Sequence, residues 1–435
     1  MARFLTASRA LRAGYLLTYA LVALAGCLSL FTGDWKVEWY DSPSYFEAAQ
    51  SLSWGMADRV RTPLYPALIL LLDAIAGKGA VMTGLRVVQW GLFFVGVGVM
   101  KRTAVRLWGD GVAALAATAL FALYPAYWVY NDSILTESLA VTMTVFMVGA
   151  ITRGQQTRSR AAVVMAWVWL AALLALRPAL VGYLPVVAVW GLMLKGRRCL
   201  SGVMLALTVG LLGGYTALMR HTYGISRLTT VSATNTFATL RLNGFIAPTD
   251  YADPYTRASL ECAFAESGTV PTLEEWGGEN LTSMVLLGPQ GYDRMIAEAA
   301  RRYRGEMAGC VVRRVERDVA DYPLFEHRLF FWRYVRQAPP SPSILWGAWG
   351  LAVTGIALLG AMAVRRRWMP VAFVLCGLPS ALMVTAIAGA QGEFTRLFTP
   401  AMPVMMLWGV WLVVGFVETL FGAFDHLGKR DGHGG

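Results

Sequence analysis

Long apolar runs constrain this chain more than any other feature of its sequence. About ten runs approach the roughly 18 residues that cross a bilayer as a helix, and polar segments separate them. Inside lipid, backbone N–H and C=O groups must bond within the segment, which favours helices. We therefore predict an all-α integral membrane protein with about ten transmembrane helices. A shorter apolar helix at residues 63–76 is expected to dip into the membrane without crossing it. The predicted spans are residues 13–31, 80–100, 111–130, 134–151, 161–180, 181–194, 199–219, 344–364, 369–388 and 397–421.

The composition agrees with a membrane protein that crosses the bilayer many times, and it argues against several other classes. Of the 435 residues, 56% are hydrophobic and only 15% are charged, which is the wrong balance for a soluble domain. The four histidines lack metal-ligand spacing. The chain has neither a P-loop for phosphate nor a dinucleotide-binding fingerprint. We expect no metal and no cofactor.

The placement of the basic residues predicts the topology. With the N-terminus in the cytoplasm, every inner segment is rich in Lys and Arg, as the positive-inside rule requires. The segment 220–342 instead has equal numbers of basic and acidic residues. The net charge of +11 therefore reflects topology and contact with membrane lipids, and it does not indicate nucleic acid. Both termini are expected inside. The basic inner residues are Arg3, Arg9, Arg12, Lys101, Arg102, Arg106, Arg153, Arg158, Arg160, Lys195, Arg197, Arg198, Arg365, Arg366, Arg367, Lys429 and Arg430.

This topology divides the chain into three modules. Residues 1–219 form an N-terminal transmembrane module, and residues 343–435 form a C-terminal one. Between the seventh and eighth spans, residues 220–342 form an outer domain. Apolar residues recur at helical spacing from Tyr292 to Val311, so this domain is predicted to be mostly helical.

The first outer loop, residues 34–80, does not have the composition of a plain connector. Asp41 precedes Ser42 and Pro43, which suit the N-cap and the first position of a helix. Four apolar residues then recur on one face, so a short helix is expected to lie flat at the interface. They are Tyr45, Ala48, Ala49 and Leu52. The loop returns to the membrane through Arg61, which faces Asp41 at the lip of a membrane pocket. Two interpretations stay open: Asp41 takes part in chemistry, or it only caps the helix.

Six further charged residues are expected at the same outer face. Ionisable groups at the mouth of a membrane bundle are costly to bury, so each invites a functional interpretation. They come from the second span, the turn between the third and fourth, the end of the fifth and the stretch before the last. Each also has a structural interpretation: a cap, a first-turn acid, a snorkelling arginine or an ion pair. The six are Arg86, Asp132, Glu137, Arg177, Glu393 and Arg396.

These motifs resemble those of the GT-C membrane glycosyltransferases, which include protein O-mannosyltransferases and aminoarabinose transferases acting on lipid A. The pattern from Asp41 through Tyr45 to the run at residues 61–66 carries the resemblance. Three later stretches, residues 135–139, 176–178 and 393–396, continue it in the same order. Each motif alone is a weak signal, and together they cover about a fifth of the chain.

Two departures from the family pattern affect the expected chemistry. The family often has two adjacent acids in the first loop, whereas Ser42 follows Asp41 here. The usual Pro-Pro before the leucine is Thr62-Pro63. The first departure leaves less room for a metal and places the role of general base on Asp41 alone.

The resemblance implies a transferase that moves a hexosyl or pentosyl group from a polyprenyl-phosphate-linked donor to a glycan, lipid or protein acceptor. Asp41 would take the proton from the acceptor hydroxyl, and single displacement would invert the anomeric carbon. Arginines would hold the phosphate. The protein would lie in the inner (plasma) membrane, with its active site facing the periplasm or exterior. The expected substrate-binding residues are Tyr45, Arg61, Tyr65, Arg86, Asp132, Glu137, Arg177, Glu393 and Arg396.

Two other functions also fit the sequence. A transporter or flippase of a lipid-linked or amphipathic substrate would explain charges within the membrane, although the chain lacks the two matching halves of an inverted repeat. A non-catalytic assembly protein would act through its outer domain, and Asp41 would then be dispensable.

The outer domain contains the two cysteines that lie outside the apolar runs, Cys262 and Cys310. Because an external compartment permits disulfides, we predict a bridge between them. Two buried thiols are the alternative.

Overall fold

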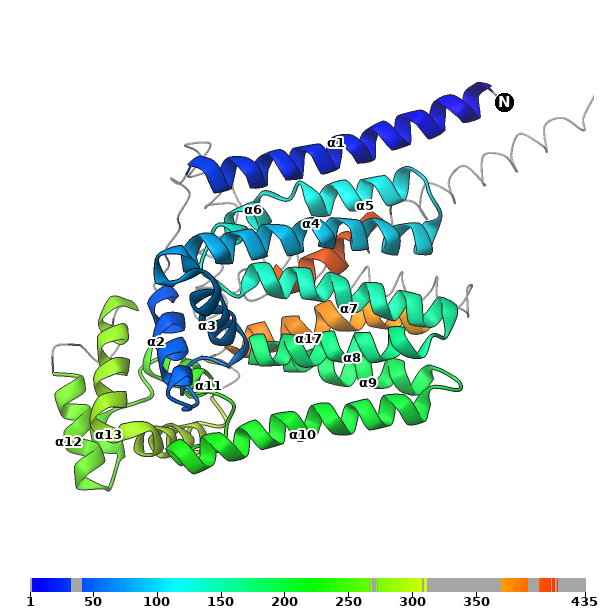
Figure 1. Cartoon of the computed structure of the whole chain (residues 1–435). Helices are drawn as coiled ribbons and strands as arrows, with labels where there is room; N and C mark the ends of the chain where they lie inside the picture. Colours follow the sequence, from blue (N-terminus) through cyan, green and yellow to red (C-terminus); the bar gives the residue numbers. More distant parts are fainter. Residues whose placement is uncertain are drawn as a thin grey trace, which may run out of the picture.

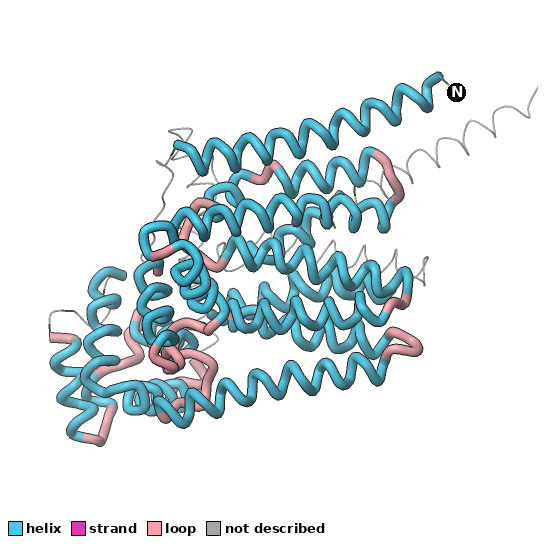
Figure 2. Tube along the Cα trace, in the orientation of Figure 1, coloured by secondary structure: helices cyan, strands magenta, loops and turns pink. Residues whose placement is uncertain are grey.

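Helices make up all the regular structure of the part of the chain that the structure describes (Figure 1; Figure 2). This computed structural model describes residues 2–32, 41–265, 267, 271, 273–306, 309–310, 369–389, 399–407, 409–410 and 413. The α-helices are α1 (Ala2–Thr32), α2 (Ser42–Ser53), α3 (Leu64–Ala76), α4 (Val81–Trp108), α5 (Val112–Ala122), α6 (Pro125–Asn131), α7 (Glu137–Thr157), α8 (Arg160–Leu176), α9 (Tyr183–Met193), α10 (Arg198–Tyr223), α11 (Val231–Arg241), α12 (Pro254–Ala263), α13 (Leu273–Arg302) and α17 (Met369–Gly389). Short 3-10 helices are η1 (Lys78–Ala80), η2 (Pro178–Gly182), η3 (Pro248–Asp250) and η5 (Thr399–Ala401).

The long helices run side by side in one bundle. In Figure 1, α1, α4, α5, α7, α8, α9, α10 and α17 share a common direction, while α2 runs across one end. The helices α3, α11, α12 and α13 gather at that same end. One end of the bundle therefore consists of tight turns between helices. The other end carries α2 and α3 of the first loop together with α11, α12 and α13.

Among the residues that the structure describes, three helices are long and apolar enough to cross a membrane: residues Ser8–Phe31, Lys78–Trp108 and Arg198–Tyr223. They contain the predicted first, second and seventh spans. Helices α5 and α6 form a fourth candidate, bent by 44° at a short break, where the third span is predicted. The protein is thus membrane-embedded, and its described part is all-helical with at least three candidate spans, while ten spans and the orientation of the termini stay predictions.

The predicted fifth and sixth spans depart from the prediction in one respect. A single apolar stretch was expected to run to residue 180, but α8 ends at Leu176. Arg177 has extended backbone angles (φ −152°, ψ 100°), and Pro178 then starts η2. Since proline disfavours a helical conformation in the residue before it, the chain breaks here and presents Arg177 at the domain-bearing end.

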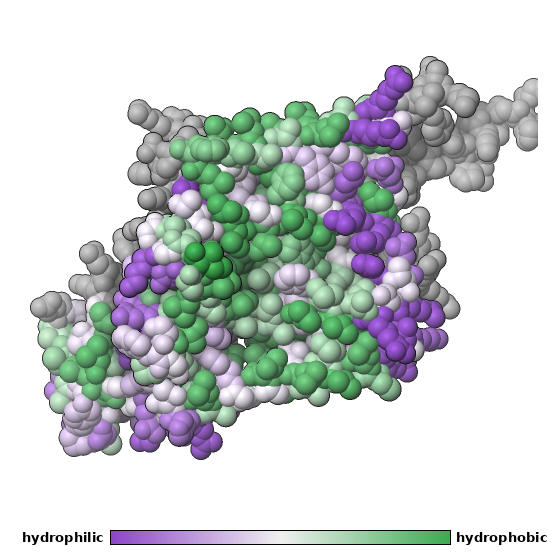
Figure 3. Space-filling model, viewed as in Figure 1, coloured by the Kyte–Doolittle hydropathy of each residue, from purple (hydrophilic) through white to green (hydrophobic). Residues whose placement is uncertain are grey.

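The surface separates into an apolar belt and two polar ends. Figure 3 shows a green, hydrophobic surface along the bundle, with purple, hydrophilic residues at both ends. The turns α4–α5, α7–α8 and α9–α10 lie at the end where α1 begins (Figure 1). Two of them are joined by Arg197, whose Nε donates to the carbonyl of Arg158 at 3.0 Å. These turns carry the basic residues predicted to share one side of the membrane.

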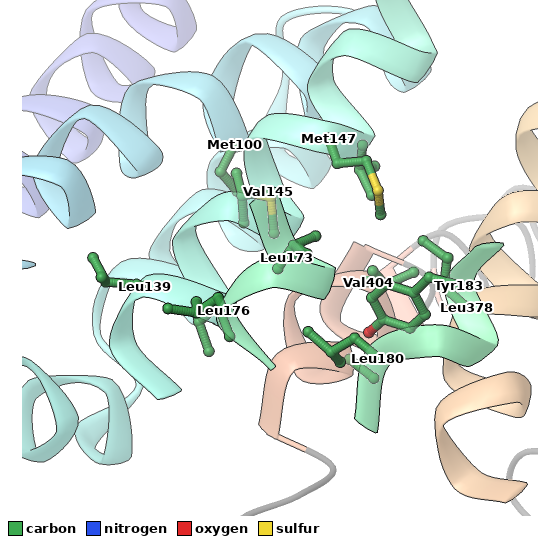
Figure 4. Close-up of a cluster of buried hydrophobic side chains, with 14 of the residues drawn as sticks. Met100, Leu139, Val145, Met147, Leu173, Leu176, Leu180, Tyr183, Leu378 and Val404 are labelled. Atoms are coloured by element: carbon green, nitrogen blue, oxygen red, sulfur yellow. The ribbon is translucent and has the colours of Figure 1, made fainter. Parts of the chain in front are cut away.

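Close packing fixes the bundle core. Figure 4 shows one cluster of its buried side chains, from α4, α7, α8, α9, η2, α17 and the stretch after η5. At Gly149 in α7, an added Cβ would lie 2.6 Å from a Val99 Cγ of α4. Such a contact is too short for real atoms, so α4 and α7 approach each other only because position 149 has no side chain.

Residues 233–303 have an apolar core of their own, built from α11, α12 and α13. One ion pair is buried within it. Arg241 donates to both oxygens of Glu279, with Nη2–Oε1 at 2.7 Å and Nε–Oε2 at 3.0 Å. The guanidinium also stacks 4.1 Å from the centre of the Phe264 ring. This pair joins α11 to α13.

The predicted disulfide is wrong in this structure. Cys262 and Cys310 are not joined: Cys262 is exposed near the end of α12, whereas Cys310 is buried. A bridge requires the two cysteines to lie close together, which helical spacing alone does not ensure. Leu260 takes the buried position in α12, so Cys262, two residues on, points to the surface.

We predict that Gly149→Val destabilises the bundle. Overpacking a tight contact costs about 1–3 kcal/mol, so thermal unfolding in detergent should begin at a lower temperature. Gly210→Val is the matched control, because an added Cβ at Gly210 in α10 meets nothing within 4 Å. Equal effects of the two changes would contradict the close approach of α4 and α7.

We also predict that Glu279→Gln loosens the domain. Removing one partner of a buried ion pair leaves an uncompensated charge and costs about 3–5 kcal/mol. Limited proteolysis should therefore cut residues 233–303 faster. Glu298→Gln is the control, because its 2.9 Å pair with Arg302 is exposed and should matter by about 0.5 kcal/mol or less.

Candidate functional site

An acid–arginine pair marks the junction between the first loop and the bundle. Arg61 Nη2 lies 2.6 Å from Asp41 Oδ1, and the two side chains are 16% and 32% exposed. Asp41 occupies the N-cap position of α2, but its side chain makes no cap hydrogen bond. The interpretation of Asp41 as only a helix cap is therefore wrong: its carboxylate turns to the guanidinium instead.

The predicted N-cap role of Ser42 is also wrong. Ser42 is the first residue of α2, and its hydroxyl donates to the carbonyl of Ile134 at 3.2 Å. One turn further along α2, the hydroxyl oxygen of Tyr45 lies 3.5 Å from Thr136 Oγ1. These two contacts fasten α2 to the stretch before α7. The predicted apolar face is confirmed at Tyr45 and at the two alanines after it, which are buried.

Arg61 is held in one orientation by several groups of α2. Its Nε donates to Ser44 Oγ at 2.7 Å, and its Nη1 lies 3.5 Å from the Tyr45 hydroxyl. The guanidinium carbon lies 4.4 Å from the centre of the Tyr45 ring, within the range of a cation–π contact. Fixed planar donors of this kind suit a carboxylate or a phosphate.

A second pair, Glu137 and Arg177, lies buried beside this loop. Arg177 Nη1 is 2.7 Å from Glu137 Oε1, and the side chains are 10% and 0% exposed. The pair ties the first turn of α7 to the residue after α8. Thr62 Oγ1 donates to the carbonyl of Leu176 at 3.1 Å, which attaches the stretch after Arg61 to the same corner.

A third pair, Arg86 and Asp132, belongs to a buried polar network between α1, α4 and α6. Arg86 Nε is 3.8 Å from Asp132 Oδ1, and its Nη2 donates to the carbonyl of Ser29. Asp132 also accepts from the indole of Trp90 at 2.9 Å and from the Ser29 hydroxyl. Asp132 follows α6 as its C-cap, so its side chain serves this network rather than the start of α7.

Tyr65 is joined to α4 and, through it, to the link between α6 and α7. Its ring packs edge-on against Tyr45 at 4.9 Å, and its hydroxyl donates to Gln89 Oε1 at 3.0 Å. Gln89 Nε2 donates onward to the carbonyls of Asn131 and Ser133 at 2.8 and 3.0 Å. Tyr65 is fully buried and shapes the floor of the site.

The structure brings together most of the predicted site residues at one end of the bundle, but in three separate pairs. Glu393 and Arg396 lie outside the described residues. Several participants were missed by sequence reasoning: Ser29, Ser44, Gln89 and Trp90. Small polar and indole side chains within apolar runs give no distinctive pattern, although a polar residue such as Gln89 inside a predicted span is a usable signal. Among the described residues, no group of three or more His, Cys, Asp or Glu is placed to hold a metal ion.

No family model matches this chain, and no curated protein does. Among solved structures, it is similar to the archaeal oligosaccharyltransferase AglB from Archaeoglobus fulgidus, which is in complex with an inhibitory peptide and a dolichol-phosphate. The identity is 14% and the TM-score 0.41, over 95% of this chain and 51% of that one. It is also similar to ArnT from Cupriavidus metallidurans, at 16% identity and a TM-score of 0.38, over 92% of this chain and 78% of that one.

This chain spans about half the length of the archaeal oligosaccharyltransferase. Because both TM-scores lie below 0.5, these likenesses do not indicate the activity of this chain.

Proposed function

We propose that this protein is a membrane glycosyltransferase of the GT-C type, which transfers a sugar from a polyprenyl-phosphate-linked donor to an acceptor hydroxyl. The observation that carries the proposal is the Asp41–Arg61 pair, partly exposed at one end of an apolar bundle. Such a reaction needs a base, a cation for the phosphate and an apolar surface for the lipid. Asp41 and Arg61 can supply the first two, and the apolar belt of the bundle can supply the third (Figure 3).

In the proposed reaction, the acceptor oxygen attacks the anomeric carbon of the donor sugar. Asp41 takes the proton of that hydroxyl as the new C–O bond forms. The bond between the anomeric carbon and the phosphate oxygen breaks, and the electron pair leaves with the lipid phosphate. One displacement inverts the configuration at that carbon.

Arg61 is the proposed phosphate ligand. Its guanidinium is fixed by Ser44 and Tyr45 at one edge and can stabilise the charge that develops on the leaving phosphate. The pairs Glu137–Arg177 and Arg86–Asp132, with Tyr65, form the supporting floor, since their side chains are buried. Glu393 and Arg396 stay candidate ligands of the donor or acceptor.

The proposed site faces the periplasm or exterior. Supporting this side, the turns rich in Lys and Arg lie at the opposite end of the bundle (Figure 1), and such turns favour the cytoplasm. The lipid chain of the donor would lie along the apolar belt, with its phosphate at the boundary where Arg61 sits.

We predict that Asp41→Asn lowers sugar transfer by about 10²- to 10⁴-fold, because the amide keeps the shape but cannot accept the proton. The assay is transfer by the purified protein in detergent from a panel of polyprenyl-phosphate sugars. Transfer in this assay also separates an enzyme from a transporter, which would show none. Asp73→Asn, in α3, is the matched control with an expected activity near wild type. Near-normal turnover in Asp41→Asn would contradict the role of base.

We further predict opposite effects on binding of a polyprenyl monophosphate without sugar. Asp41→Asn removes a carboxylate that competes for Arg61, so affinity should rise, by up to about fivefold for a partly exposed pair. Arg61→Lys should lower affinity although it keeps the charge, because an ammonium lacks the planar fork. Arg257→Lys, in the domain, serves as the control. Unchanged affinity in Arg61→Lys would remove Arg61 from the phosphate site.

A further inference from the structure

The stretch between α2 and α3 carries Arg61 without helical support of its own. Within it, Asp58 Oδ1 accepts the backbone N–H groups of Val60 and Arg61 at 2.8 and 2.6 Å, which closes a tight turn. This turn sets the local shape of the chain. It does not by itself fix where the turn lies relative to α2, which holds Asp41.

Two residues distant in sequence hold this turn in place. They are Tyr223, the last residue of α10, and Thr230, just before α11. The hydroxyl of Tyr223 donates to the carbonyl of Ala57 at 2.5 Å, across 166 residues. Thr230 donates to the carbonyl of Arg59 twice, from its backbone N–H at 2.8 Å and from its hydroxyl at 3.2 Å. Both acceptors are backbone carbonyls of the stretch that leads directly into Arg61.

Apolar packing reinforces these bonds. Ala57 is buried with Met219 and Ile225, and the rings of Tyr215 and Tyr223 lie against them. A buried backbone carbonyl needs a hydrogen-bond partner, and Tyr223 provides it for Ala57. The apolar cluster and this hydrogen bond together hold Ala57.

The end of α10 is shaped to deliver these contacts. Gly224 has φ +71° and closes the helix, with its N–H donating to the carbonyl of Arg220 at 2.9 Å. A left-handed residue at this place turns the chain back at little cost when it is glycine. The turn places Thr230, at the start of α11, against Arg59.

Arg61 is therefore anchored on both sides along the chain. Before it, Arg59 is tied to Thr230; after it, Thr62 is tied to the end of α8. A shift of about 1 Å in a group that binds a reacting substrate can cost on the order of 10²-fold in rate. The backbone on either side of Arg61 is held by Thr230 and by the end of α8, which are distant from it in sequence.

We propose that Tyr223 and Thr230 are positioning residues, through which the start of the outer domain holds Arg61 in place to receive the phosphate of the donor. This inference rests on the proposed function, and it adds a role for the domain: its first residues complete the geometry of the site at the membrane surface.

The test measures binding of a polyprenyl monophosphate to the full-length protein in detergent. The variant Tyr223→Phe with Thr230→Val loses two hydroxyl bonds and should bind the lipid phosphate about fivefold to tenfold more weakly. The same two changes in an Arg61→Gln background should cause no further loss, because their effect passes through Arg61. Thr230→Ser keeps the hydroxyl and should bind as the wild type does.

The matched control is Tyr255→Phe with Thr239→Val. Tyr255 donates to the carbonyl of Leu286 at 2.6 Å and Thr239 to that of Asn235 at 2.8 Å, both within the domain. This control should leave binding unchanged. Lipid-phosphate binding is also measured for each single substitution, and thermal unfolding is measured for every variant. If a double variant fails to fold, its two single variants provide the test.

The outcomes separate the two proposals. An equal loss in the wild-type and Arg61→Gln backgrounds, or the same loss in the control variant, would overturn the positioning role and leave the proposed function standing. If Arg61→Gln itself binds the lipid phosphate as well as the wild type, Arg61 is not a phosphate ligand. The positioning role of Tyr223 and Thr230 is then overturned as well.

Discussion

The cost of placing charge in an apolar bundle governs this end of the molecule. Charges removed from water are stable only when paired and hydrogen-bonded, and the three pairs described here differ in burial. Glu137–Arg177 and Arg86–Asp132 are almost entirely covered, whereas Asp41–Arg61 remains partly open to solutes. The two buried pairs thus stabilise the fold, whereas the Asp41–Arg61 pair is accessible from solution.

Each pair also joins elements that the chain alone would not bring together. Glu137–Arg177 holds the start of α7 to the break after α8. The network around Asp132 ties α1 to α4 and α6, and Asp41–Arg61 closes α2 onto the stretch before α3. The buried pairs form a rigid floor, so the open pair stands on a surface whose shape is already set.

Local features of the site were predictable from sequence, and long-range ones were not. The buried face of α2 follows from periodicity over a few turns. The start of a helix after Asp41 follows from Pro43, and the approach of Arg61 follows from the return of the first loop to the membrane. The expected cap at Ser42 was wrong because its hydroxyl finds Ile134 instead. The disulfide was wrong because helical spacing does not tell which face of α12 is covered. The bonds from Tyr223 and Thr230 end on backbone carbonyls, which carry no residue signature.

The anchoring of the chain around Arg61 has a consequence for how a substrate would displace the resting pair. With the backbone held at Arg59 and Thr62, the guanidinium can leave Asp41 only by turning about its own side-chain bonds. A short rotation of this kind needs no rearrangement of α2 or α3. A phosphate that takes one edge of the guanidinium would therefore release the carboxylate a few ångströms away, where an acceptor hydroxyl must lie. In the proposed reaction, binding of the donor and exposure of Asp41 as the base would then be two results of one side-chain movement.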